Sequence, residues 1–399
     1  MRWQPSRMRL TEFMEVMTGV SATRLFNSHA RATDEFTIRL AGGGVGRAAP
    51  SYGETIGIHE DQSSINGGLL TGSAILDLLT EEAVGREWDQ AGWDGWLAEH
   101  FDRMGRNNAS ALSEAFWNAA EPVHPLRAEL PYLVLNIING GEHAYTHPML
   151  SDFHEFCLVA ADRDPDKVLA AFTEVAARVR ERLAGAERVL VNGNPVHVLG
   201  VRDNRAALEL LLEVLDRAGY SADFALYIDA AAGDLRDGDG YRLNVTGAGD
   251  FASGELVDYW ARLVSEYPIS WLEDPLHEDD HDAWVALTGL IGDRCHVIGD
   301  NYYSTDADRI RAGGQRGTAN AVLVKPNQAG TVTATRAAVA AARETGQLPI
   351  ASHRSISTES LLTSRMTVTE RIDHFKIGPL LTDYSSVMRL NELIRLNGA

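Results

Sequence analysis

The chain has 399 residues and 45% hydrophobic content, enough for two domains or for one large barrel with an appendage. Its formal net charge of −20 argues against nucleic acids and anionic membranes as partners, because like charges repel at short range. No run of eighteen uncharged apolar residues occurs and no signal-peptide pattern is found at the N-terminus, so we expect a cytoplasmic protein. Cys157 and Cys295 lie in apolar runs and are expected to be reduced and buried.

Residues 1–127 mix short strand-like and helical segments, which predicts an α+β domain. A strand is expected at 34–40, with helices near 75–84 and 111–120. The glycine-rich run at 41–57 does not match a dinucleotide-binding loop, because Arg47 stands where the third glycine would be. We interpret this run as a glycine-hinged lid, with a plain flexible loop as the alternative.

From residue 128 to 399, short apolar runs alternate with segments of helical period, for example at 252–267, 332–346 and 386–396. This alternation predicts a parallel α/β barrel of the TIM type. In such a barrel the carboxyl ends of the strands meet on one face, where catalysis takes place. Six successive apolar runs each finish on a titratable side chain, and these residues are Asp229, Glu273, Asp300, Lys325, His353 and Lys376.

Asp229, Glu273 and Asp300 are carboxylates from consecutive strand ends, and we predict that they hold a metal ion. Hard oxygen donors suit Mg²⁺, which completes its octahedral shell with water and substrate oxygens. Without a cation, converging carboxylates would repel one another. Lys325 and Lys376 could neutralise them structurally, but lysines beside a metal also suit removal of a proton next to a carboxylate.

Five motifs follow one another along the barrel half: NIINGGEHA (136–144), WLEDPLHEDD (271–280), VIGDN (297–301), VLVKPNQAGTVT (322–333) and SHRS (352–355). In sequence and in order they resemble motifs of the enolase family, and the likeness runs from about residue 128 to 380, with a fainter one at 22–38. The resemblance implies an enolase-like α/β barrel with an N-terminal α+β capping domain, a homodimer and a small anionic carboxylate or phosphate substrate. It also implies Mg²⁺ with a lysine base, as in enolase-superfamily sites.

The resemblance also implies individual roles for residues within these motifs. Lys325 would be the base that removes the proton from C2, and Lys376 would bind the carboxylate and enolate oxygens. His143 and Glu155 would lie near the phosphoryl group and the leaving hydroxyl. The phosphate and the carboxylate would be held by His353, Arg354 and Ser355.

The family's acidic G-D-E-G-G segment is missing from this chain. When residues 207–220 are aligned with the helix that follows this segment in the family, residues 192–197 fall in its place, with Gly193 and Asn194 at the acidic pair. We expect Asn194 to contact substrate, but an asparagine cannot act as a general acid, whose loss costs about 10²- to 10⁴-fold in rate. Glu155, His154 or His197 are the candidate replacements, and His154 is also expected to bind substrate.

Three other departures concern the leaving-group and phosphate ends of the site. Thr55 is the best stand-in for the serine of the family's lid, Asn301 replaces the second aspartate of G-D-D, and the basic stretch after the last lysine becomes GPLLTDYSS (378–386). The metal and base positions are kept while the surroundings change, which favours the same first half-reaction on a different substrate.

This pattern leaves three hypotheses about function. The first is a carbon-oxygen lyase acting on an analogue of 2-phosphoglycerate, such as the precursor of carboxyphosphonoenolpyruvate in phosphonate and phosphinate natural product biosynthesis. The second is a glycolytic enolase with a relocated general acid. The third is a catalytically silent paralogue that serves as a binding protein.

Overall fold

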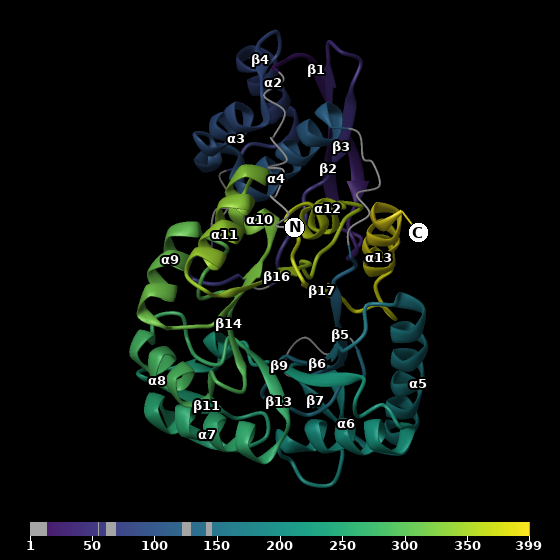
Figure 1. Ribbon diagram of the computed structural model, residues 1–399, viewed down its shortest axis with the longest axis vertical. Coiled ribbons are helices and arrows are strands. Elements are labelled where there is room, and N and C mark those ends of the chain that lie inside the picture. The colour runs from purple at the N-terminus through teal and green to yellow at the C-terminus, as the bar shows by residue number, and fades with distance from the viewer. Residues whose placement is uncertain (1–13, 55, 61–68, 122–128, 141–145, 399) are drawn as a thin grey trace, which may run out of the picture.

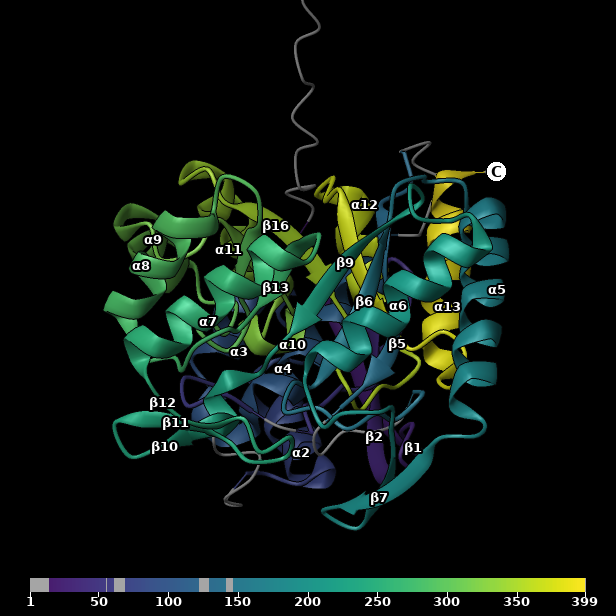
Figure 2. The same cartoon turned by 90° about the horizontal axis from the view of Figure 1, so that it is seen from below.

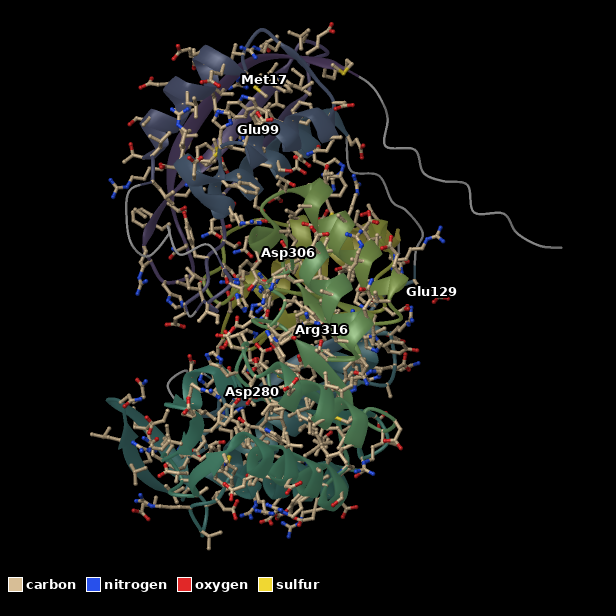
Figure 3. The ribbon with its side chains drawn as sticks, turned by 90° about the vertical axis from the view of Figure 1, so that its left-hand side faces the viewer. Met17, Glu99, Glu129, Asp280, Asp306 and Arg316 are labelled. Carbon is tan, nitrogen blue, oxygen red and sulfur yellow. The ribbon has the colours of Figure 1, made fainter. Side chains whose placement is uncertain are left out.

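The computed structural model describes residues 14–54, 56–60, 69–121, 129–140 and 146–398. Within these ranges an antiparallel sheet with its helices, here called the cap, lies against one end of a closed eight-stranded barrel (Figure 1). Figure 3 shows this stacking from the side, with Met17 and Glu99 in the cap and Asp280 and Arg316 in the barrel. The fold is therefore mixed α/β, as the sequence predicts.

The cap is built on a four-stranded antiparallel sheet in the order β3-β2-β1-β4. Phe36 and Ile38 on the sheet pack with Leu79, Trp93 and Leu112 on the helices in one buried cluster. The predicted strand at 34–40 and both predicted helices are confirmed. The elements are β1 (Glu15–Phe26), β2 (Ala32–Leu40), β3 (Val45–Ala48), β4 (Glu87–Trp88), α2 (Gly72–Glu82), α3 (Gln90–Ala98) and α4 (Phe101–Ala120).

The first part of the glycine-rich run forms the turn and second strand of the β2–β3 hairpin. This hairpin packs closely on α4: a Cβ on Gly46 would lie 2.0 Å from the carbonyl oxygen of Ala115. Gly44 approaches the same helix at Ala119 in a similar way. These two glycines thus permit close backbone packing rather than a hinge. Opening of the later part of the run as a lid stays a prediction.

The barrel closes in the order β13-β14-β15-β16-β17-β5-β6-β9. Its interior is filled by apolar side chains, among them Tyr227, Trp271, Ile298 and Ile350. A filled interior leaves the strand ends as the place for chemistry. The strands are β5 (Tyr132–Asn139), β6 (Glu155–Ala160), β9 (Phe224–Asp229), β13 (Ile269–Glu273), β14 (His296–Gly299), β15 (Ala321–Val324), β16 (Leu348–Ser352) and β17 (His374–Gly378).

One strand departs from the predicted parallel arrangement. β6 runs antiparallel to both β5 and β9, whereas the other neighbouring strands are parallel. Glu155, the first residue of β6, therefore lies opposite Asp229, the last residue of β9. A strict repeat of parallel strands would have placed the start of β6 at the opposite end of the barrel. The reversal brings Glu155 to the end at which the other strands finish.

Helices cover the outside of the barrel, and Figure 2 shows α5 and α13 on one side of the strands with α8 and α9 on the other. The helices predicted at 252–267, 332–346 and 386–396 are confirmed as α7, α11 and α13. They are α5 (Pro165–Leu183), α6 (Arg205–Ala218), α7 (Ser253–Glu266), α8 (His281–Ile291), α9 (Ala307–Arg316), α10 (Pro326–Ala329), α11 (Val332–Glu344), α12 (Leu362–Thr369) and α13 (Tyr384–Asn397).

Small elements decorate the loops between strands and helices. The 3₁₀ helix η1 and the strand β10 follow β9, and two small antiparallel sheets pair β7 with β8 and β10 with β11 and β12. The elements are β7 (Glu187–Val191), β8 (Asn194–Val198), η1 (Ala232–Leu235), β10 (Arg236–Asp237), β11 (Gly240–Leu243) and β12 (Gly249–Ala252).

Polar contacts from α3 and α4 fix the cap on the barrel. Arg106 Nη1 donates to the carbonyl oxygen of Ala329 at 3.1 Å, and the backbone N–H of Thr333 donates to Asp94 Oδ2 at 2.8 Å. These contacts place the cap over the segment that follows β15. The predicted domain boundary between residues 127 and 128 stays a prediction, because residues 122–128 lie outside the described part.

Both cysteines are free and buried. Burial raises the pKa of the Cys157 thiol well above 9.0 and that of Cys295 to about 12, so both stay protonated at neutral pH. Cys157 packs in the barrel interior. Among the described residues, no helix is long and apolar enough to cross a membrane.

Candidate active site

A cavity of about 720 Å³ lies where the carboxyl ends of the barrel strands meet the cap. The cap contributes Ser28, His29, Arg31 and Glu54 to its wall. Glu273 is fully buried beneath the wall. The predicted site residues that line the cavity are His154, Glu155, Asp229, Asp300, Lys325, His353, Arg354, Ser355 and Lys376.

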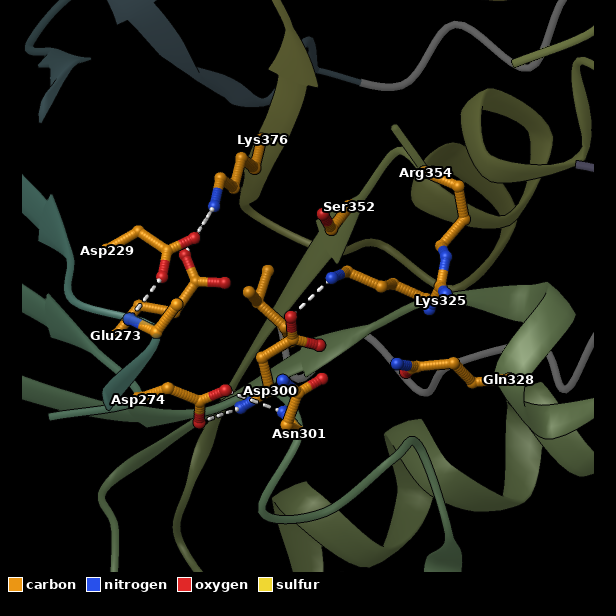
Figure 4. Close-up of polar contacts among 12 residues, drawn as sticks. Asp229, Glu273, Asp274, Asp300, Asn301, Lys325, Gln328, Ser352, Arg354 and Lys376 are labelled. Carbon is orange, nitrogen blue, oxygen red and sulfur yellow. Dashed lines mark hydrogen bonds and ion pairs between the residues drawn. The ribbon is translucent and has the colours of Figure 1, made fainter. Parts of the chain in front are cut away.

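Lys376 on β17 lies among three carboxylates, two of which are drawn in Figure 4. Its Nζ is 2.9 Å from Glu155 Oε2 and 2.8 Å from Asp229 Oδ2, and it also contacts Glu273 Oε2, to which the Tyr227 hydroxyl donates. Burial lowers the pKa of Lys376, but attraction to the carboxylates outweighs it and raises this pKa well above 10.5. Lys376 is therefore a cation suited to hold an anionic oxygen.

Glu273 and Asp229 are affected differently by this one ammonium group. Burial and the charge of Asp229 raise the pKa of Glu273 well above 4.5, despite the nearby Lys376. Burial also acts to raise the pKa of Asp229, but the charge and hydrogen bond of Lys376 make the net shift downward. The one ammonium thus lowers the pKa of Asp229 but does not offset the effect of burial on the pKa of Glu273.

Lys325, directly after β15, forms an ion pair with Asp300, directly after β14 (Figure 4). The backbone N–H groups of Asp300 and Asn301 donate to the carboxylate of Asp274 at 2.9 and 2.8 Å. Asp274 has a φ of 40°, a left-handed conformation that residues other than glycine rarely adopt. Burial and the charge of Asp300 raise the pKa of Asp274 well above 3.8. Asp274 thus fixes the turn that presents Asp300 to Lys325.

The three predicted metal ligands fit Mg²⁺ in their donor chemistry but are paired with lysines in this structure. In the described part of the chain, no three acidic, histidine or cysteine side chains are arranged so as to hold a metal ion. Glu273 Oε1 and Asp300 Oδ1 are nevertheless buried without a hydrogen-bond partner. Buried carboxylate oxygens seldom lack a partner, and hard oxygen donors are what Mg²⁺ prefers. Asp229, Glu273 and Asp300 therefore stay the predicted ligands of this ion.

Arg354 and Ser355 follow β16 and face the loop that leaves the cap. The Arg354 guanidinium donates two hydrogen bonds to the carboxylate of Glu60, at 2.9 and 3.1 Å, and these side chains are only 5% and 6% exposed. The backbone N–H of Glu54 donates to Ser355 Oγ at 2.8 Å. These contacts, together with the hydrogen bond from the Ile58 N–H to Glu278 Oε1, fasten residues 52–54 and 56–60 to the barrel.

His353 is held as a neutral imidazole beside this loop. Burial lowers its pKa well below 6.5, and nearby cationic side chains lower it further. Its Nδ1 is 2.9 Å from the carbonyl oxygen of Arg354, which can only accept, so Nδ1 carries the proton. Gly378 lies against the ring, since a Cβ there would be 2.9 Å from Nδ1. The imidazole is therefore fixed in one orientation and in one tautomer.

The structure does not bring Asn194 to the cavity, contrary to the prediction. Asn194 is an exposed residue at the start of β8, where it pairs with Val191 across a hairpin turn. His197 on the same strand does not line the cavity either, and its ring contacts the Pro148 carbonyl oxygen and Arg188. An alignment to the family's acidic segment could not foresee this hairpin.

Two of the predicted replacements for the acid do lie in the wall. His154 Nε2 is 3.4 Å from Asp234 Oδ2, and Glu155 contacts Lys376. His143 and Thr55 lie outside the described residues.

A family model described as the enolase C-terminal TIM barrel domain matches residues 127–399. This chain belongs to the enolase family. Membership agrees with the closed barrel and its α+β cap, and it implies enolase-type hydro-lyase chemistry on a small anionic substrate, typically with Mg²⁺.

Several wall residues of this enolase-family site escape sequence reasoning. Asp274 could have been found, because it follows Glu273 in the E-D-P motif. Asn136 and Asn139 could have been found in the same way, because they belong to the first family motif. Arg31 lies within the fainter likeness at 22–38, but no local pattern encodes the position of its cap turn over the barrel.

Proposed function

We propose that this protein is a Mg²⁺-dependent lyase that removes the proton next to a carboxylate and eliminates a β-hydroxyl from a 2-phosphoglycerate-like substrate. The observation that carries the proposal is the placement of Lys325 and Lys376. They project from different strands into one cavity, and each is paired with predicted Mg²⁺ ligands. Family membership supports the reaction class.

The two lysines are assigned different tasks. Lys325 takes the α-proton, for which it needs an unprotonated amine. Lys376 stays cationic among its carboxylates and stabilises the negative charge that develops on the substrate's carboxylate. Asp229, Glu273 and Asp300 would hold Mg²⁺, which would supply positive charge next to the developing enolate. Asp300 would then have a second cation beside it and would depend less on Lys325 as its ion-pair partner.

The departing hydroxyl also needs a proton, and we assign that proton to His154. Its imidazole lines the cavity and is paired with Asp234. Glu155, the other candidate in the wall, is engaged by the Lys376 ammonium. In this assignment the base directly follows strand β15 and the acid directly precedes strand β6, far apart in the sequence.

The substrate is proposed to be an analogue of 2-phosphoglycerate with a different head group. Asn194 does not replace the family's acid in the cavity, while the lysines and the strand-end carboxylates do line or underlie it. A molecule such as the precursor of carboxyphosphonoenolpyruvate, from phosphonate or phosphinate biosynthesis, fits this pattern. Glycolytic enolase activity with a relocated acid and a silent binding protein are the competing outcomes.

The test is exchange of the α-proton of 2-phosphoglycerate in D₂O with Mg²⁺, followed by ¹H NMR, with ³¹P NMR to detect phosphoenolpyruvate. Wild-type protein is expected to exchange the proton, and Lys325→Ala to lose about 10²- to 10⁴-fold of that rate. Lys167→Ala, a change at an exposed lysine on α5, is the matched control. His154→Gln should retain exchange but slow elimination on any substrate that the wild type eliminates.

The alternatives give distinct results in the same experiment. Phosphoenolpyruvate formed at ordinary enolase rates would indicate a glycolytic enolase and would overturn the altered substrate. No exchange above the rate of Lys325→Ala would indicate a silent paralogue. Exchange that depends on Lys325, with little elimination, is the expected result.

A further inference from the structure

The turn at residues 27–31, here called the cap turn, joins β1 to β2 and reaches the cavity. Asn27 Oδ1 accepts hydrogen bonds from the backbone N–H groups of His29 and Arg31, both at 3.0 Å. Asn27 N–H also donates to the Arg31 carbonyl oxygen at 3.0 Å, and Ala30 has a φ of 55°. The turn therefore has one defined shape rather than that of a loose surface loop.

The cap turn is docked on the barrel loop that carries Arg354. The N–H of Ser28 donates to the Ser357 carbonyl oxygen at 2.8 Å, and the N–H of Ser357 donates back to Ser28 Oγ at 3.0 Å. Ser357 Oγ in turn donates to the carbonyl oxygen of Arg354 at 2.9 Å. The position of the cap turn is thus tied to the barrel loop that carries Arg354.

Arg31 differs from three other cationic side chains of the cavity in whether it is paired with a carboxylate. Lys325, Lys376 and Arg354 are each paired with a carboxylate. The Arg31 guanidinium lines the cavity without a hydrogen-bond or ion-pair partner among the residues that the structure describes. A guanidinium presents a planar fork of donors that matches a carboxylate or a phosphoryl group.

We propose that Arg31 forms a subsite for a second anionic group, of the carboxylate class, at the head-group end of the substrate. The cavity of about 720 Å³ has room beyond a three-carbon acid phosphate, because ligand pockets of roughly 300–1,000 Å³ hold drug-sized molecules. Arg31 is then a specificity-determining residue that distinguishes this substrate from 2-phosphoglycerate. The assignment rests on the proposed function, since it concerns the same cavity.

The experiment compares two small probes that differ only in the extra group. Phosphonoformate carries a carboxylate on its phosphonate, whereas methylphosphonate carries a methyl group. Binding of each to the full chain with Mg²⁺ is measured by isothermal titration calorimetry. Arg31→Met should lower the affinity for phosphonoformate by roughly 10- to 100-fold, which is the range for a lost charge-assisted contact. It should lower the affinity for methylphosphonate by less than about 2-fold.

Arg31→Lys keeps the charge but not the fork, and its affinity for phosphonoformate should fall between wild type and Arg31→Met. Arg24→Met, a change at an exposed arginine on β1 of the same hairpin, is the matched control and should leave both affinities unchanged. If Arg31→Met lowers the affinity for both probes equally, or for neither, the subsite assignment is wrong. Far-ultraviolet circular dichroism of each variant checks that the cap is folded.

Failure of the subsite and failure of the proposed function give different results. Exchange of the 2-phosphoglycerate proton tests the function without reference to Arg31. If exchange depends on Lys325 and the probes do not discriminate, the subsite is wrong and the function stands. If the probes discriminate and no exchange occurs, the cavity binds a doubly charged head group and the lyase assignment is wrong.

Discussion

Glu114 on α4 is a buried carboxyl that joins the cap to the barrel, and its replacement is expected to change how stability depends on pH. Ser360 Oγ donates to its Oε2 at 2.6 Å, and the N–H of Leu361 donates to its Oε1 at 3.1 Å. Burial raises the pKa of Glu114 from 4.5 to about 7, although these hydrogen bonds act to lower it. The folded protein therefore holds this proton more tightly than the unfolded chain does.

The sign and size of the effect follow from that shift. Between pH 4.5 and about 7 the folded state binds more protons than the unfolded state, so stability falls as pH rises and then levels off. At about 1.4 kcal/mol per pH unit, the full loss is roughly 3 kcal/mol. Glu114→Gln keeps the shape and cannot ionise. It should match wild type near pH 4.5 and exceed its free energy of unfolding by roughly 3 kcal/mol at pH 8.

The assay is urea denaturation of both proteins from pH 4.5 to 8, because the difference between them cancels the other titrating groups. Glu99→Gln, at an exposed carboxylate after α3, is the matched control and should follow wild type at every pH. If Glu114→Gln differs from wild type by a constant amount at every pH, the carboxyl does not change its ionisation on folding and the reasoning fails.

Two further predictions concern the loop and the cap. Glu60→Gln removes the charge that holds the Arg354 guanidinium in place. The KM for 2-phosphoglycerate exchange should rise by about 10-fold, with a smaller effect on kcat. A fall in KM would mean that Glu60 competes with substrate instead. Gly46→Ala should destabilise the protein by roughly 2–4 kcal/mol in thermal denaturation, because its Cβ would meet the Ala115 carbonyl oxygen. Gly19→Ala, where a Cβ meets nothing within 4 Å, is its control.

Much of the barrel half could be predicted because a simple rule connects its sequence to its geometry. Apolar runs that end on Asp229, Lys325 and His353 become strands whose ends meet on one face. The direction of β6 could not be predicted this way, since an apolar run has the same period in either direction. Asn194 was misplaced for a related reason, because alignment transfers a position and not the hairpin that now carries it.

The contacts that shape the far side of the cavity join residues too distant in the chain for any local pattern to reveal. Glu60 and Arg354 are 294 residues apart, and Ser28 and Ser357 are separated by 329. Strand-end residues converge because the barrel closes, whereas cap residues reach the cavity only through docking of one unit on another. Chemistry set by the barrel can then stay constant while the cap changes which head group is accepted. Arg31 lies on that changeable wall, so substitutions there should alter substrate choice before they alter proton removal.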